Sequence, residues 1–274
     1  MVKKNDSKMN EQPIVIIKCG GSILKHGSEL HSLINGINTL KNQGFVIVIV
    51  HGGGPDINQL CEALNIKSQF VKGLRITDKD VLNVTQMALL GKTNNNLVHK
   101  LNIAKIRSIG LSGHDDNLLK AKFIDQVRLG HVGEIVDVNT KLLFDLLNLG
   151  LTPVIAPLGV DDEGNAYNVN GDVVAGAIAA AIACDQLVLL SDVPGFYQDF
   201  NDKSSLVAKI TSSKITTLLQ KKQISGGMIP KLAACLDAVN AGVKSAHIVS
   251  GKEDNWLNVV TDRQSNIGTT VIKG

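Results

Sequence analysis

The chain has 274 residues, which is enough for one large domain or for two lobes. A net charge of +3 and an aromatic content of 3% give neither the basic surface nor the stacking platform of a nucleic-acid-binding protein. The sequence has no apolar run of the roughly 18 residues needed to span a bilayer, and its polar N-terminus does not resemble a signal peptide, so a cytoplasmic protein without membrane partners is expected.

Short apolar runs rich in valine and isoleucine alternate with longer stretches of helical period. Strands are expected at residues 14–17, 45–50, 106–111, 153–157, 187–190 and 246–249. Their hydrophobicity is continuous, which marks strands covered on both faces, as in a parallel sheet. Helices are expected at residues 28–43, 57–64, 78–101, 139–149, 172–184, 213–222 and 228–241. This alternation predicts an α/β protein with a doubly wound sheet.

Two stretches interrupt the alternation. Residues 117–138 alternate in hydrophobicity and contain Gly130 and Gly133, and residues 159–170 are rich in turn-forming residues. Each stretch predicts a β-hairpin outside the main sheet. A change of lobe is expected near residue 184, with residues 1–183 forming an N-terminal lobe and residues 184–274 a C-terminal lobe.

The first expected strand ends in Lys18, which is followed by Cys19 and the glycine pair Gly20 and Gly21. An ammonium group is costly to bury unpaired, so Lys18 is expected to meet an anion. Glycines allow a backbone to approach a bulky group closely. The pattern therefore predicts a phosphate site beyond this strand.

A second glycine-rich turn, HGGGPDINQL, lies between the next strand and a helix. Pro55 suits the first turn of that helix, whose free N–H groups would point at an anion. One such turn could serve tight packing alone. Two of them at the carboxyl ends of strands, where α/β proteins bind ligands, favour a binding site. His51, beside the glycines, either lines this site or is structural.

Polar residues also precede or begin two later helices. Asp172 begins an alanine-rich helix, where it either stabilises the helix dipole or also holds nearby lysines in place. Asn168 and Asn170, just ahead, offer amides for a polar ligand or for local hydrogen bonds. The segment SGGMIPKL places Lys231 in the first turns of another helix, which is unfavourable for a cation unless an anion binds there.

The sequence gives no support for a P-loop, for reactive cysteines or for a metal site. Residues 91–93 read GKT like the end of a P-loop, but Gln86 replaces the required glycine, so Lys92 is expected on a helix surface. The four cysteines are expected to be small buried hydrophobes. No His, Cys and Asp grouping has metal-ligand spacing, so no metal site made by the protein alone is expected.

Nine motifs, in order from about residue 14, resemble those of the amino acid kinase family, and within it the enzymes that phosphorylate N-acetyl-L-glutamate. They are IIKCGGSIL, VIVHGGGPDINQL, VKGLRITD, ALLGKTNNNLV, GLSGHDDNLLKA, GHVGEIVDVN, PVIAPLGVDDEGNAYNVNGDVVAGAIA, LVLLSDVPG and GGMIPKL. The resemblance implies a three-layer αβα sandwich around a mainly parallel sheet. It also implies phosphoryl transfer from ATP, with Mg²⁺ held mainly by the nucleotide phosphates, to the side-chain carboxylate of N-acetyl-L-glutamate in arginine biosynthesis.

The same resemblance implies roles for individual residues. Lys18 and Lys231 would stabilise the transferring phosphoryl group, Asp172 would position both lysines, and the Gly21 N–H would bind the phosphoryl group. Residues that would bind the acid are Gly53 and Gly54 near its reacting carboxylate, Arg75 at its α-carboxylate, and Asn168. The adenine nucleotide would lie against Asp192, Val193, Pro194, Gly195, Phe196, Tyr197, Gln223, Ile224 and Ser225.

This assignment makes chemical sense without a catalytic histidine. A side-chain carboxylate with a pKa near 4.3 is already an ionised nucleophile at pH 7 and needs no general base. The task of the site is then alignment and charge neutralisation, which lysines, backbone amides and Mg²⁺ can supply.

Some alternatives stay open. The short, polar N-terminal segment and the sequence of residues 250–270 differ from the arginine-inhibited members of the family, so a homodimer with weak or no arginine feedback is expected. The substrate could instead be a related acid such as carrier-bound 2-aminoadipate, although the LRITD segment favours free N-acetyl-L-glutamate. An inactive nucleotide or amino-acid sensor is disfavoured, because it would not need both lysines and Asp172.

Overall fold

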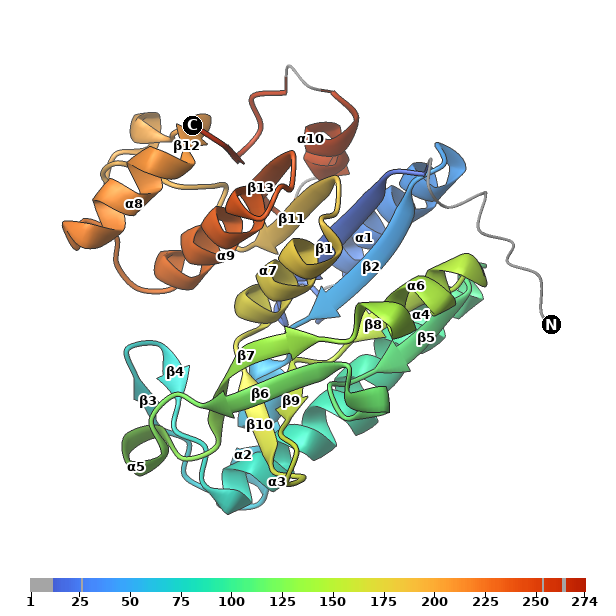
Figure 1. Cartoon of the computed structure of the whole chain (residues 1–274), viewed down its shortest axis with the longest axis vertical. Helices are drawn as coiled ribbons and strands as arrows, with labels where there is room; N and C mark the ends of the chain where they lie inside the picture. Colours follow the sequence, from blue (N-terminus) through green and yellow to red (C-terminus); the bar gives the residue numbers. More distant parts are fainter. Residues whose placement is uncertain (1–11, 26, 253, 263–264) are drawn as a thin grey trace.

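An eight-stranded sheet runs through the centre of the computed structural model, which describes residues 12–25, 27–252, 254–262 and 265–274 (Figure 1). In spatial order its strands are β12 (Lys209–Thr211), β14 (Thr269–Ile272), β13 (Ser245–Ser250), β11 (Gln186–Ser191), β1 (Ile14–Cys19), β2 (Val46–His51), β8 (Thr152–Ile155) and β5 (Ser108–Leu111). Neighbours from β13 to β5 pair in parallel, whereas β14 runs antiparallel to β13. The predicted sheet, mainly parallel, is confirmed.

The central strand β1 shows why the apolar runs are continuous. Ile14 and Ile16 pack into the core on one face of the sheet, whereas Val15 and Ile17 pack into the core on the other. Successive side chains of a strand point to opposite faces. Because helices cover both faces, every position of the strand must be apolar until it reaches the edge at Lys18.

Helices form a layer on each side of the sheet, which confirms the αβα sandwich. One face packs against α6 (Thr140–Asn148), α7 (Gly171–Ile182), α8 (Ser212–Gln220) and α9 (Met228–Asn240). The other packs against α1 (Gly27–Asn42), α4 (Asn95–Ile103), the 3-10 turn η5 (Asp254–Leu257) and α10 (Asn258–Thr261).

Both predicted hairpins are present, and together they form a small barrel that was not predicted. The first pairs β6 (Leu119–Phe123) with β7 (Val132–Val138) around the short helix α5 (Gln126–Leu129). The second pairs β9 (Leu158–Val160) with β10 (Ala166–Val169). The four strands close into a small barrel in the order β10-β7-β6-β9. The barrel lies at the carboxyl edge of the main sheet, below β2 in Figure 1.

The helix predicted at residues 78–101 is continuous but not uniformly α-helical. It consists of α3 (Lys79–Gln86), the π-helix η2 (Met87–Asn94) and α4. Asp78 caps its start, because the side chain accepts a hydrogen bond from the Val81 N–H. Together with α2 (Gly54–Ala63), this helix forms a third, smaller apolar cluster.

Several short elements were not predicted. They are β3 (Phe70–Val71), β4 (Leu74–Arg75), β12, β14, α10 and the 3-10 turns η3 (Asp115–Asn117), η4 (Lys203–Ser205) and η5. Each is too short to show a periodic pattern. The expected lobe boundary near residue 184 falls between α7 and β11, and because β11 pairs with β1, one sheet serves both halves of the chain. The division into lobes stays a prediction. Within the described ranges, no helix has the length and apolar character to cross a membrane.

Helices α7 and α9 pack unusually closely. A Cβ atom added to Gly176 would lie 2.8 Å from the Cβ of Ala234 and 2.9 Å from its Cα. Only hydrogen at position 176 permits this approach. The contact lies one turn beyond Asp172 on α7 and Lys231 on α9, so it sets the distance between these two side chains.

We expect Gly176→Ala to lower the free energy of unfolding by about 1–3 kcal/mol, because the added methyl group overlaps α9. The measurement is urea unfolding at pH 7. The matched control is Gly91→Ala in η2, where an added Cβ meets nothing within 4 Å and the higher helix propensity of alanine makes the change neutral or slightly stabilising. Equal stability of both variants would contradict the close packing of α7 and α9.

Candidate active site

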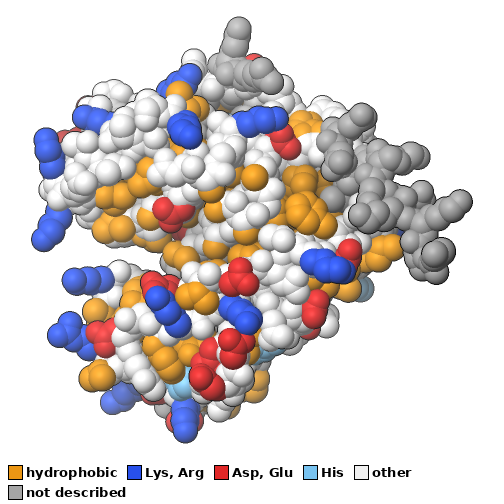
Figure 2. Space-filling view, in the orientation of Figure 1, with side chains coloured by type: hydrophobic (Ala, Val, Ile, Leu, Met, Phe, Trp, Pro, Cys, Tyr) orange, Lys and Arg blue, Asp and Glu red, His pale blue; other side chains and the backbone are white. Residues whose placement is uncertain are grey.

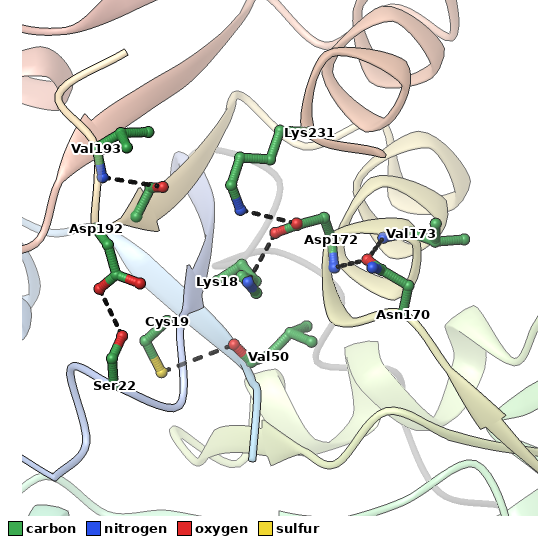
Figure 3. A network of polar contacts seen from close by, with 11 residues as sticks. Lys18, Cys19, Ser22, Val50, Asn170, Asp172, Val173, Asp192, Val193 and Lys231 are labelled. Carbon is green, nitrogen blue, oxygen red and sulfur yellow. Dashed lines mark hydrogen bonds and ion pairs between the residues drawn. The ribbon is translucent and has the colours of Figure 1, made fainter. Parts of the chain in front are cut away.

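Two lysines and one aspartate, distant in sequence, meet at the carboxyl edge of the sheet (Figure 3). Lys18 comes from the end of β1, Asp172 from the first turn of α7 and Lys231 from the first turn of α9. The Lys18 Nζ lies 2.8 Å from Asp172 Oδ1, and the Lys231 Nζ lies 2.8 Å from Asp172 Oδ2. Each carboxylate oxygen therefore holds one ammonium group, as expected if Asp172 organises the lysines.

This cluster carries a net positive charge in a buried place. The side chains of Lys18 and Lys231 are 10% and 14% exposed, and that of Asp172 is 6% exposed. Burial tends to raise the pKa of Asp172, but the charges and hydrogen bonds of the two lysines outweigh it, so the pKa lies below its ordinary value. Burial and the nearby Lys18 charge lower the pKa of Lys231. One carboxylate does not neutralise two cations, so the cluster is poised to receive an anion.

The two glycine-rich turns interlock beside the cluster. A Cβ added to Gly21 would lie 2.9 Å from Pro55 Cδ and 3.2 Å from the Gly53 nitrogen. The Gly52 N–H donates to the Cys19 carbonyl, at 2.8 Å. Gly171 leaves room for the Lys18 side chain, whose Cε would lie 3.3 Å from an added Cβ. These glycines allow three chain segments to meet at one point.

One cavity, of about 190 Å³, lies on the side of the glycine turns. All four residues that the resemblance assigns to acid binding line it: Gly53, Gly54, Arg75 and Asn168. Its further lining residues include Gly52, Phe70, Val132, Pro157 and Gly171. Val132 belongs to the barrel strand β7, so the barrel forms one wall of this cavity.

Arg75 is 8% exposed and is held by uncharged groups. Its Nη2 donates to Asn58 Oδ1 at 2.7 Å, its Nη1 donates to the Ser68 hydroxyl, and its guanidinium carbon lies 4.7 Å from the centre of the Phe70 ring. Within the described residues no carboxylate forms an ion pair with it. A guanidinium placed in this way can bind a ligand carboxylate through two parallel hydrogen bonds, that is, in a bidentate manner.

A second cavity, of about 450 Å³, lies on the side of α9. It is lined by Asp192, Val193, Gly195, Phe196, Tyr197, Gln223, Ile224 and Ser225, which are eight of the nine residues expected at the nucleotide. The ninth, Pro194, is exposed and does not line the cavity. The Ser22 hydroxyl donates to Asp192 Oδ1 at 2.6 Å and so ties the first glycine turn to this cavity (Figure 3).

The two cavities flank the charge cluster. Lys231 lines the larger cavity, whereas Gly171, next to Asp172, lines the smaller one. The molecular surface is indented between the part that carries α8 and α9 and the part that carries β3, β4 and α5 (Figure 2). On the face shown there, positive and negative side chains are interspersed and no basic stripe is present. The arrangement can hold two ligands with their reacting ends near the lysines.

The structure adds residues that sequence reasoning did not assign. Gln198, Phe200 and Met228 line the larger cavity together with Gly226 and Gly227. The glycines were visible in the SGGMIPKL motif, but the other side chains carry no distinguishing pattern. The Thr269 hydroxyl accepts a hydrogen bond from the Phe196 N–H at 2.7 Å, and only the folding of β14 against this loop reveals it.

Three residues left open by the sequence have hydrogen-bond partners within the fold. The Asn170 side chain caps α7, since it accepts from the N–H groups of Asp172 at 2.8 Å and Val173 at 3.3 Å. The Asn168 amide donates to the Thr77 hydroxyl at 3.1 Å while lining the smaller cavity. His51 is fully buried, lies within hydrogen-bond distance of Asn94 and lines neither cavity.

The expectations for the cysteines and for Lys92 are confirmed. All four cysteines are free and buried. Lys92 lies on η2 with a half-exposed side chain, where it pairs with Asp56 at 3.1 Å. Over the described part of the chain, no group of three or more His, Cys, Asp or Glu side chains has metal-binding geometry.

A mainly parallel αβα sheet, with buried positive charge between two cavities at its carboxyl edge, defines an α/β protein built to bind anionic ligands. The chain belongs to the amino acid kinase family, whose sequence profile matches residues 13–250. An acetylglutamate kinase from Geobacillus stearothermophilus is 44% identical over 244 residues, which cover 89% of this chain and 92% of that enzyme.

Solved structures agree with this assignment. The crystal structure of smu.665 from Streptococcus mutans has a TM-score of 0.80 at 30% identity and covers 95% of this chain and 99% of that one. A carbamate kinase from Giardia lamblia, bound to AMP-PNP, has a TM-score of 0.70 at 15% identity and covers 97% of this chain and 100% of that one. At that identity the likeness concerns the fold alone.

We expect Asp172→Asn to lower the free energy of unfolding by about 3 kcal/mol, because two buried ammonium groups lose their counter-charge. Inorganic phosphate should restore more stability to this variant than to the wild type, since it supplies the missing anion. Urea unfolding with and without phosphate measures both effects. The control is Asp145→Asn, whose exposed pair with Lys141 should contribute little to stability. A phosphate effect no larger in Asp172→Asn than in the wild type would contradict the anion site.

Burial lowers the pKa of His51 from 6.5 to about 4. Between these values the unfolded chain binds a proton that the folded protein does not, so stability is retained above pH 6.5 and lost as the pH falls toward 4. From pH 7 to pH 5 this group should account for about 2 kcal/mol of the loss. Comparing the free energy of unfolding at these two values, His51→Gln should lose less than the wild type by that amount. Identical losses would show that His51 titrates normally in the folded protein.

Proposed function

We propose that the protein transfers the γ-phosphoryl group of ATP to the side-chain carboxylate of N-acetyl-L-glutamate, forming N-acetyl-L-glutamyl 5-phosphate in arginine biosynthesis. Family membership and the similarity to acetylglutamate kinases over most of both chains support this reaction. The observation that carries the proposal is the buried Lys18–Asp172–Lys231 cluster, whose uncompensated charge lies between two cavities.

The smaller cavity is assigned to the amino-acid substrate. Arg75 would bind the α-carboxylate, since its guanidinium is oriented by Asn58 and Ser68 without being neutralised. Asn168 would hold the acetamido group, and the N–H groups of Gly53 and Gly54 would meet the reacting carboxylate. The residues of this cavity all belong to the N-terminal part of the chain, in keeping with the proposed lobe of residues 1–183.

The larger cavity is assigned to ATP. Its size suits the base and ribose of a nucleotide, and its opening at Lys231 would direct the phosphates toward the cluster. Its lining residues come from the part of the chain after residue 184, in keeping with a C-terminal nucleotide lobe. Mg²⁺ would be held mainly by the phosphates, where it would neutralise part of their charge.

The reaction needs no proton transfer. An ionised carboxylate oxygen of the substrate forms a bond to the γ-phosphorus while the bond from that phosphorus to the β,γ-bridging oxygen breaks, and ADP leaves. Lys18 and Lys231 would stabilise the negative charge on the transferring group from two sides. Asp172 would hold both lysines in place, and the Gly21 N–H would donate to a phosphoryl oxygen. Alignment within the two cavities supplies the remaining part of the catalysis.

A cytoplasmic homodimer with weak or no arginine feedback is part of the proposal. It rests on the resemblance and on the sequence of residues 250–270, which differs from that of the arginine-inhibited members. Residues 1–11, on which the expectation also drew, lie outside the described residues.

We expect MgATP-dependent ADP release with N-acetyl-L-glutamate and little with glutamate, aspartate or 2-aminoadipate. Lys18→Ala should lower kcat by about 100-fold or more, because it removes charge stabilisation from the transition state. Arg75→Ala should instead act mainly through a higher KM for the acid. A coupled assay of ADP formation measures all of these values.

The control is Lys100→Ala, since Lys100 is an exposed lysine of α4 that lines neither cavity. It should behave like the wild type. Turnover on another acid would keep the mechanism and change the substrate. Binding of ATP without turnover on any of the four acids would favour a sensor or a carrier-dependent enzyme over the proposed activity.

A further inference from the structure

A buried histidine and a buried asparagine form a chain of contacts behind the second glycine turn. His51 is the last residue of β2 and is fully buried, and Asn94 is the last residue of the π-helix η2 and is 6% exposed. The Asn94 Nδ2 lies 2.8 Å from the Val154 carbonyl oxygen and 3.0 Å from His51 Nε2. The His51 Nδ1 lies 3.0 Å from the Gly52 carbonyl oxygen. None of these side chains has a role in the proposed chemistry.

The donors and acceptors in this chain can be assigned in only one way. A carbonyl oxygen only accepts, so the Asn94 atom beside the Val154 oxygen is the amide nitrogen. Its two hydrogens then point to Val154 and to His51 Nε2, and Nε2 must accept. The proton of the neutral imidazole is therefore on Nδ1, from which it is donated to the Gly52 carbonyl. The lowered pKa of His51 agrees with a neutral ring.

The Gly52 carbonyl is joined to the Gly53 N–H in one planar peptide group, in which the two bonds point in opposite directions. A hydrogen bond that holds the carbonyl therefore also fixes the direction of the Gly53 N–H. Gly53 is the N-cap residue of α2, where N–H groups lack acceptors within the helix, and it lines the smaller cavity.

The π-helix holds the glycine turn from both ends. Thr93 and Asn94, adjacent in η2, are both buried. The Thr93 hydroxyl donates to Asp56 at 2.8 Å, just after the turn, while Asn94 contacts His51, just before it. Helical segments of this kind often occur at functional sites. Gly110 provides the space for Asn94, because an added Cβ there would lie 2.0 Å from Asn94 Oδ1.

We propose that Asn94 and His51 are positioning residues that orient the Gly53 N–H toward the reacting carboxylate of the acid. This inference rests on the proposed function, in which Gly53 contacts that carboxylate. Asn94 fixes the tautomer of His51, and His51 fixes the peptide that carries the N–H donor. This series of hydrogen bonds from Asn94 through His51 to the Gly52 carbonyl, here called the relay, thus keeps the Gly53 N–H aligned before the substrate binds.

The first test is nitrogen NMR of the imidazole rings in the whole protein labelled with ¹⁵N-histidine. Among the seven histidines, His51, identified by the signal missing in His51→Gln, should carry its proton on Nδ1 from pH 8 to pH 6. A proton on Nε2 would overturn the relay. This result does not depend on any enzymatic activity, so it stands even where the proposed function fails.

The second test is Asn94→Asp, in which a carboxylate replaces the donor amide. The proton of His51 should move to Nε2 and the hydrogen bond to Gly52 should be lost. We expect kcat to fall by about tenfold or more while the KM for ATP stays within about twofold, because only the acid side is misaligned. A moved proton with an unchanged kcat would overturn the positioning role.

The matched control is Asn102→Asp on α4, whose amide donates to the Ser108 carbonyl at an exposed position. It should change neither the NMR signals of His51 nor kcat. Should Asn94→Asp fail to fold, the tautomer of the wild-type protein still decides whether the relay exists. Absence of turnover in the wild type would reject the proposed function without bearing on the tautomer.

Discussion

Two ammonium groups that share one buried carboxylate are the interaction on which the rest of the site depends. Lys18, Asp172 and Lys231 come from β1, α7 and α9, and they meet because the carboxyl ends of parallel strands and the first turns of the following helices share one edge. In a buried pair of one cation and one anion, the two charges neutralise each other and no ligand is needed. Two cations on one carboxylate leave one positive charge without a counter-charge. A phosphoryl group can neutralise that charge, which favours a transferase over a purely structural ion pair.

Close backbone packing makes this cluster possible. Gly176 lets α7 and α9 approach so that Asp172 reaches Lys231, and Gly171 leaves space for the side chain of Lys18. Gly21 and Gly53 bring the two glycine turns into contact. The glycines of this chain therefore serve both tight packing and ligand binding, and the one role does not exclude the other.

The two cavities are formed by different parts of the chain. The larger one is formed by loops after β11 and before α9, and it is linked to the first glycine turn through Ser22 and Asp192. The smaller one is enclosed by the barrel, the β3–β4 hairpin and the second glycine turn, behind which the π-helix packs. Movement of one half of the chain relative to the other would alter both cavities at the lysines, which is where a kinase must exclude water.

Local patterns in the amino-acid sequence were sufficient to predict the alternation of strands and helices, the two hairpins and an anion site at Lys18 and Lys231. The residues expected around the two cavities came instead from the resemblance to the amino acid kinase family. Continuous apolar runs reveal strands covered on both faces, and a lysine at the buried end of such a run, as at Lys18, requires an anionic partner. Three features became visible only in the folded chain: the closure of the two hairpins into one barrel, the support of the Phe196 loop by Thr269, and the contact of His51 with Asn94 behind Gly52. Periodicity and turn chemistry act over a few neighbouring residues, whereas these contacts join segments that become neighbours only when the sheet is assembled.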